Sequence, residues 1–191
     1  MTENPQEEVT HTSAARKFPL WGTVLAFTIL AVFLVMIGLG LQRTQQGPIR
    51  IGQGVPPITL TTFGGEEIST TAMQGKIIVI NFWASWCKPC EGEAADMEAV
   101  WKEYAPGGKV VFLGVDYVDT EPAARKYLDT FAISYPNGPD LGTRISQTFR
   151  ITGVPETYFI DQNGKLVYAQ KGPFGSQAEI KAIIDPLLQQ N

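Results

Sequence analysis

The sequence has few of the residues that bind metals. Its 191 residues include two cysteines, Cys87 and Cys90, and a single histidine, His11. A zinc site usually needs four Cys or His ligands, so a Cys-x-x-Cys pair without two further ligands does not favour zinc. A structural disulfide closing so short a loop would restrict the unfolded chain little. Redox chemistry is therefore the favoured interpretation of the cysteine pair.

The sequence also lacks basic clusters, internal repeats and low-complexity tracts. The net charge is −4, and residues 51–191 contain 11 Lys and Arg against 16 Asp and Glu. Binding to nucleic acid requires neutralisation of phosphates, so no nucleic-acid partner is expected. The apolar fraction of 44% suffices for an ordinary globular core. The length fits one domain with an appendage.

One long stretch carries no charge at all. Residues 20–41 are apolar or neutral throughout, and a helix of that length would span about 33 Å, against about 30 Å for a bilayer core. We predict a transmembrane anchor over residues 18–41. A cleaved signal peptide is the rival interpretation, but its apolar stretch is usually about 7–15 residues and ends at a small-x-small site.

Charges around this stretch suggest its orientation. Arg16 and Lys17 precede it, and the positive-inside rule then places the N-terminus in the cytoplasm. The rest of the chain would lie outside, in a compartment that permits disulfides. We expect residues 1–17 to be a disordered cytoplasmic tail and residues 42–56, rich in Gly and Pro, to be a linker. Residues 57–191 would form the globular domain.

Strand and helix patterns alternate along that domain. We predict strands over residues 58–61, 76–83, 110–115, 157–160 and 166–169, and helices over residues 88–105, 121–131, 144–149 and, capped by Ser176, up to 189. The run over residues 76–83 is continuously apolar and β-branched, which is typical of a strand covered on both faces. The alternation predicts an α/β fold with a mixed sheet and helices on both faces.

The cysteine motif lies where the buried strand passes into a helix. Unpaired amides and the dipole at a helix N-terminus stabilise an anion there, so we assign the attacking thiolate to Cys87. Cys90 lies one turn further and would resolve the mixed disulfide. Lys88 adds a positive charge that favours the thiolate. Pro89 suits the first turn of the helix.

Residues 81–90, NFWASWCKPC, resemble the active-site segment of the thioredoxin superfamily. Within it, residues 52–191 are most similar to the membrane-tethered TlpA/ResA/CcmG-like branch. The resemblance implies a thioredoxin-like fold and a thiol–disulfide oxidoreductase whose only redox group is the Cys87–Cys90 disulfide, with no other cofactor and no metal. It also implies that residues 116–150 hold an insert that plain thioredoxins lack.

The same resemblance assigns a substrate platform. The bond between Val154 and Pro155 would be cis and face the cysteines, and the Val154 backbone would pair with an extended substrate segment. Trp86, next to Cys87, would contact the substrate too. Glu156 would belong to an acidic rim that selects partners, or would be a solvated surface charge.

Glu93 stands three residues after Cys90, where ResA-like proteins carry a glutamate. A carboxylate there could accept the proton of Cys90 when that thiol becomes a nucleophile. The alternative is a first-turn helix acid stabilised by the dipole. The buried aspartate of thioredoxin corresponds to Asn81, which cannot accept a proton, and this directs attention to Glu93.

The resemblance favours a reductant of protein disulfides, with apocytochrome c before haem attachment as a substrate. Such a role implies a membrane electron donor of the CcdA/DsbD type. Three alternatives stay open from the sequence: an oxidant that introduces disulfides, a thiol peroxidase, and a tethered binding domain without catalysis.

Overall fold

The computed structural model describes residues 20–44 and 49–189, which fall into two separate units divided after Gly47. The first unit contains one helix, α1 (Leu20–Thr44). Its window Trp21–Leu39, with a mean hydropathy of 2.5, is long and apolar enough to cross a membrane. The predicted tail over residues 1–17 lies outside the described residues.

The second unit is built on a five-stranded sheet. Its strands, in spatial order, are β5 (Asn137–Pro139), β4 (Val110–Asp116), β3 (Ile77–Trp83), β6 (Glu156–Ile160) and β7 (Leu166–Lys171). The first three strands are mutually parallel, whereas β6 and β7 run antiparallel to their neighbours. All seven residues of β3 are buried, as expected for a central strand covered on both faces.

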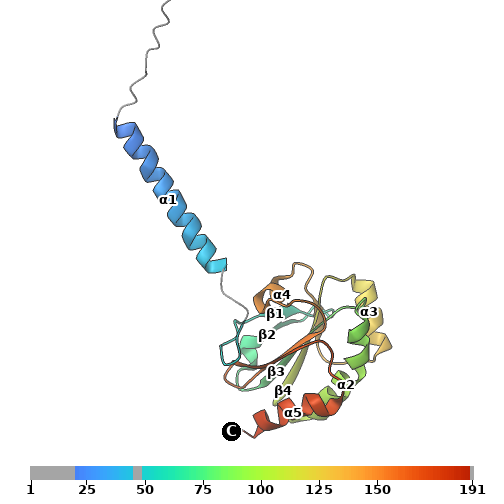
Figure 1. Ribbon diagram of the computed structural model, residues 1–191. Coiled ribbons are helices and arrows are strands. Elements are labelled where there is room, and N and C mark those ends of the chain that lie inside the picture. Colours follow the sequence, from blue (N-terminus) through green and yellow to red (C-terminus); the bar gives the residue numbers. More distant parts are fainter. Residues whose placement is uncertain (1–19, 45–48, 190–191) are drawn as a thin grey trace, which may run out of the picture. The chain divides into compact units, whose positions relative to one another are not determined.

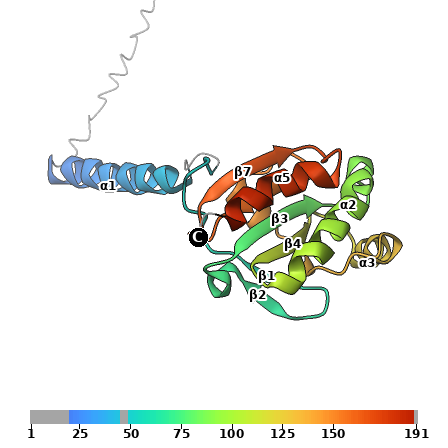
Figure 2. The same cartoon turned by 90° about the horizontal axis from the view of Figure 1, so that it is seen from below.

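Helices cover both faces of this sheet (Figure 1). Side chains of α2 (Lys88–Tyr104) and α5 (Gln177–Leu188) pack on one face, and Figure 2 shows these two helices side by side in front of the strands. On the opposite face lie α4 (Arg144–Phe149) and β1 (Thr59–Thr61). This is a thioredoxin-like mixed sheet, which confirms the predicted fold class.

The segment between β4 and β6 contains a strand, β5, besides the two helices that the sequence patterns predict. It forms α3 (Glu121–Thr130), then β5, then α4. Strand β5 and the hairpin strand β2 (Glu67–Ser69) were not predicted, because three residues are too few to show a period. Helix α3 contributes side chains to the buried cluster that contains both cysteines.

Two predicted boundaries differ in detail. Ser176 occupies the N-cap position of α5, but its side chain makes no capping bond; instead Glu179 accepts the amide hydrogen of Gly175 at 3.0 Å.

Residues 52–55, which the sequence assigns to a linker, hydrogen-bond to the β6–β7 hairpin. Leu166, for example, exchanges backbone hydrogen bonds with Gly52 and Gln53.

Candidate active site

The cysteine pair lies between the central strand and the first long helix. Strand β3 ends at Trp83, and Cys87 is the N-cap residue of α2. Cys87 and Cys90 form a disulfide, so the structure represents the oxidised protein. The backbone N–H of Cys90 donates to the Cys87 sulfur at 3.2 Å. After reduction, the same amide and the helix dipole would stabilise a thiolate on Cys87.

The residues flanking the pair differ in exposure. Both cysteines are buried, whereas the side chain of Trp86 is 60% exposed. Lys88 is exposed as well, and its ammonium group forms an ion pair with Glu91 at 2.6 Å. Because Glu91 partly neutralises it, Lys88 contributes less to thiolate stabilisation than the sequence alone suggests.

Glu93 is a buried acid on the first turns of α2. Its side chain is 2% exposed, and it accepts hydrogen bonds from Asn81 Nδ2 at 3.0 Å and from the backbone N–H of Phe174 at 2.9 Å. Burial raises the pKa of Glu93 to about 7, although these two bonds oppose the shift. A group with this pKa exchanges protons near neutral pH. Its proton exchange with Cys90 remains a prediction.

The predicted substrate platform has the implied backbone geometry. The peptide bond between Val154 and Pro155 is cis. Val154 packs against the buried cluster that contains Cys87 and Cys90. The platform and the disulfide therefore belong to the same end of the sheet, although they are more than sixty positions apart in the sequence. Contact of Val154 or Trp86 with a substrate remains a prediction.

Glu156 is not a solvated surface charge, and its role in selecting partners remains a prediction. It is the first residue of β6 and is 2% exposed. Its carboxylate accepts hydrogen bonds from the Thr152 N–H and hydroxyl, at 2.7 and 2.6 Å, and from the Tyr158 hydroxyl at 2.6 Å. Burial raises its pKa, but these bonds and the charge of Lys171 outweigh that effect, and the pKa is lowered.

Sequence reasoning missed a tyrosine that supports the cysteine helix. Tyr127 on α3 donates its hydroxyl hydrogen to the Cys90 carbonyl at 2.9 Å. Its ring stacks on that of Trp83 with centroids 4.5 Å apart. Tyr127 follows Cys90 by 37 positions, and no local pattern connects two such distant residues.

A second buried acid was also missed. Asp116 ends β4 opposite Trp83 in the parallel register and is 1% exposed. Burial, together with the neighbouring carboxylate of Asp119, raises its pKa to about 7. In the sequence, the only indication of this site was an aspartate at the end of an apolar strand. Because polar residues commonly end strands, that pattern did not single out Asp116.

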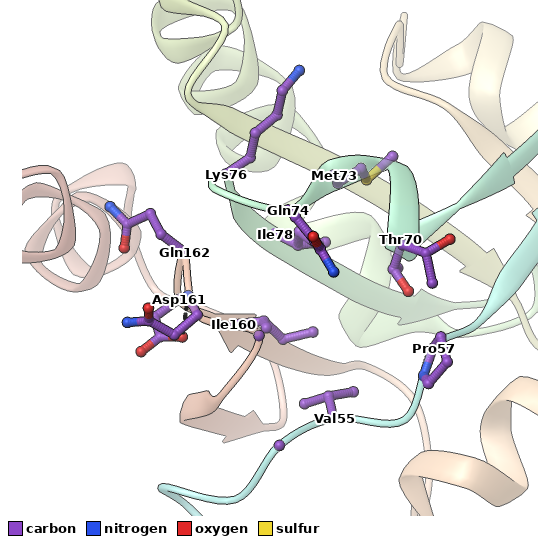
Figure 3. Close-up of a pocket in the computed structure, with 14 residues that line it drawn as sticks. Val55, Pro57, Thr70, Met73, Gln74, Lys76, Ile78, Ile160, Asp161 and Gln162 are labelled. Atoms are coloured by element: carbon purple, nitrogen blue, oxygen red, sulfur yellow. Dashed lines mark hydrogen bonds between the residues drawn. The ribbon is translucent and has the colours of Figure 1, made fainter.

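A cavity of about 530 Å³ lies away from the cysteines. It is at the beginning of β3, whereas Cys87 follows the end of that strand. Figure 3 shows Val55, Ile78 and Ile160 among its apolar lining and Gln74 and Lys76 among its polar lining. None of the predicted redox residues lines it. Within the described part of the chain, no three His, Cys, Asp or Glu side chains are grouped to hold a metal ion.

Thiol–disulfide exchange is the chemistry of a cysteine pair at a helix N-terminus. This pair, together with relatives named thiol-disulfide oxidoreductases, identifies the chain as a thiol–disulfide oxidoreductase. The chain belongs to the AhpC/TSA family, whose model matches residues 51–169.

Individual relatives agree with this assignment. The thiol-disulfide oxidoreductase ResA of Bacillus cereus is 32% identical over 119 residues, which are 62% of this chain and 68% of the relative. The thioredoxin-like protein YneN of Bacillus subtilis is 32% identical over 146 residues, or 73% of this chain and 84% of the relative. A thiol:disulfide interchange protein of Chlorobium tepidum is 28% identical, with a TM-score of 0.66 over 74% of this chain and 99% of the other.

Proposed function

We propose that this oxidoreductase reduces disulfides of protein substrates outside the cytoplasm, anchored in the membrane by α1. The observation that carries the proposal is the position of Cys87 at the N-cap of α2, where the Cys90 amide donates to its sulfur. That position favours a nucleophilic thiolate. The apolar helix α1 and the similarity to ResA-type proteins support a tethered extracytoplasmic domain.

In the reaction, the Cys87 thiolate attacks one sulfur of the substrate disulfide. A bond forms between Cys87 and that sulfur, the substrate disulfide breaks, and the departing thiolate takes up a proton. Cys90 then loses its proton to Glu93 and attacks the Cys87 sulfur, which forms the Cys87–Cys90 disulfide and expels the second substrate sulfur as a thiolate that takes up a proton. The substrate gains two electrons and two protons, and the cysteine pair is oxidised.

The surroundings of the pair would hold the substrate. Trp86 offers an exposed aromatic face next to Cys87. The resemblance to the thioredoxin superfamily supports a role for the Val154 backbone in pairing with an extended segment of the substrate. We propose further that this segment belongs to an apocytochrome c before haem attachment, and that a membrane donor of CcdA/DsbD type restores the dithiol. The resemblance to the TlpA/ResA/CcmG-like branch supports both partners.

The assignment of roles predicts a trapped intermediate. In the full chain, kept in detergent micelles, Cys90→Ser should accumulate a mixed disulfide with a protein substrate, because the resolving thiol is missing. Cys87→Ser is the matched variant and should trap none. Non-reducing gels followed by mass spectrometry of the linked peptides would show this. Trapping by Cys87→Ser alone would reverse the two roles.

The direction of electron flow is tested by the reduction potential of the Cys87–Cys90 pair. A reductant should have a potential near or below about −250 mV, since thioredoxin lies near −270 mV and the oxidant DsbA near −120 mV. A value close to that of DsbA would instead favour the introduction of disulfides. Equilibration with glutathione or dithiothreitol buffers, with the reduced fraction read by alkylation, gives this number.

A further inference from the structure

The loop between β4 and α3 is bonded to the active-site loop at three points. These are Tyr117 N–H to the Trp83 carbonyl at 2.8 Å, Trp86 Nε1–H to the Val118 carbonyl at 3.3 Å, and Ser85 N–H to Asp119 Oδ2 at 2.6 Å. Residues 83–86 lead directly into Cys87. The conformation of the nucleophile's own loop therefore depends on residues 117–119.

Asp119 makes the shortest of these three bonds. Its second oxygen, Oδ1, accepts the N–H of Thr120 at 2.7 Å, so both carboxylate oxygens hold backbone amides. Hydrogen bonds to an ionised carboxylate are about twice as strong as neutral ones. The anchored amide of Ser85 lies two residues before Cys87.

Val118, the residue before Asp119, has an unfavourable backbone conformation. Its φ is +47°, a left-handed conformation that is unfavourable for a β-branched residue. Its side chain is exposed, so burial of its own side chain does not account for this conformation. The hydrogen bonds from Trp86 to Val118 and from Ser85 to Asp119 hold the loop in it.

Asp116, the last residue of β4 before this loop, has a carboxylate without a hydrogen-bond donor among the described residues. Both of its carboxylate oxygens are buried without a donor among the described residues. Two ionised carboxylates offer no donor to each other, so Asp116 acquires a partner only when it is protonated and donates to Asp119. Burial and the charge of Asp119 both favour that protonated form, and the pKa of Asp116 is raised to about 7.

In the parallel sheet, Asp116 lies between Trp83 of β3 and Pro139 of β5. The buried cluster of Trp83 also contains the cysteine pair of α2 and Tyr127 of α3. Asp119 is the charged group that acts on Asp116. Glu93 on α2 is the other buried acid with a pKa near 7, so any experiment on Asp116 must separate the two.

We propose that Asp119 is a positioning residue for the reaction at Cys87, and that a proton shared from Asp116 holds Asp119 in place. The inference rests on the proposed function, since it takes Cys87 as the nucleophile. With the proton present, the pair carries one negative charge, matched by the amides of Ser85 and Thr120. Loss of the proton puts two negative charges together in a buried site and weakens the bond to Ser85.

Removal of the Asp119 carboxylate tests the positioning role. In the full chain in detergent micelles, Asp119→Ala should slow insulin disulfide reduction about tenfold, because the loop before Cys87 loses its anchor. Asp119→Asn keeps one acceptor oxygen and should recover most of the rate. Asp129→Asn, on the exposed side of α3, is the matched control and should match the wild type.

These rates separate the two hypotheses. A wild-type chain that reduces no insulin would overturn the proposed function. If the wild-type chain does reduce insulin, two results would overturn the positioning role alone. One is an Asp119→Ala rate equal to that of the wild type, and the other is an Asp119→Asn rate no higher than that of Asp119→Ala.

The shared proton has a separate test that does not depend on the stability of the Asp119 variants. We would follow alkylation of Cys87 by iodoacetamide from pH 5 to 9 in Glu93→Gln protein, where the acid of α2 no longer titrates. The rate should still show an inflection near pH 7 besides that of the thiol. Adding Asp116→Asn, which is neutral and of the same shape, should remove it. An inflection that persists in the double variant would overturn the role of Asp116.

Discussion

Glu93 is the residue whose burial matters most directly for the chemistry of the cysteine pair. Its carboxylate is enclosed between β3 and the segment before α5, through Asn81 and Phe174. Burial favours its neutral form, so the pKa rises to about 7. A proton acceptor with such a pKa is half charged at neutral pH, which suits the step in which Cys90 becomes a nucleophile.

Replacing Glu93 by Gln should alter the titration of Cys90. We expect the alkylation rate of Cys90, measured in a Cys87→Ser chain, to lose an inflection near pH 7, because the neighbouring acid no longer titrates. Resolution of the mixed disulfide should slow at least tenfold at pH 7, since general base catalysis typically contributes about 10²–10⁴-fold. Glu103→Gln, further along α2, serves as a control. An unchanged titration curve would restrict Glu93 to a structural role.

The residues of the site differ in how far the sequence could reveal them. Cys87 and Cys90 are only three positions apart in the chain, and the strand-to-helix pattern around them is local, so their geometry was predictable. The burial of Glu156 was not, because it depends on Thr152 and Tyr158 closing over its carboxylate. Asp116 was not predictable either, since its neighbours in the sheet come from β3 and β5.

Among the elements, β4 shows how tightly the strands around the site are packed. A Cβ on Gly114 would lie 1.6 Å from Asn137 Oδ1 and 2.9 Å from Trp83 Nε1. Those two atoms share a hydrogen bond of 2.7 Å. Only a glycine leaves room for this bond between β3 and β5. The long elements β3, β4 and α2 were predictable from their own local sequence patterns, whereas β5 exists through its pairing with β4.

Gly114→Ala should therefore destabilise the domain. The methyl group must displace Asn137 and break its bond to Trp83, and overpacking together with a lost buried hydrogen bond costs about 2–4 kcal/mol. Urea unfolding would measure the loss. Gly107→Ala is the matched control, because nothing lies within 4 Å of a Cβ at that position. Equal stabilities of the two variants would contradict this account of the packing.

For the whole molecule, the two buried acids predict a dependence of stability on pH. Glu93 and Asp116 have folded-state pKa values of about 7, above the ordinary values of 4.5 and 3.8. The folded protein therefore binds these protons more tightly than the unfolded chain does. Their contribution to stability is fully present below about pH 4 and is lost as the pH rises through 7.

The free energy of unfolding should thus be lower at pH 8 than at pH 5, by up to about 3 kcal/mol for each acid. Urea unfolding of the full chain in micelles at both pH values would measure the difference. Asp116→Asn and Glu93→Gln should each reduce it. Asp129→Asn should leave it unchanged, and equal pH dependences in all four proteins would refute the assignment.

The backbone pairing of residues 52–55 with the β6–β7 hairpin has a consequence for proteolytic cleavage between α1 and the domain. Ile49 and Val55 pack against the apolar core around β1 and α4, and Gly52 and Gln53 bond to Leu166. A protease that cuts before Ile49 would release a redox domain with its packing complete. A cut after Val55 would instead remove a wall of the cavity at the start of β3. The stability of a released domain thus depends on which of these few residues it keeps at its new N-terminus.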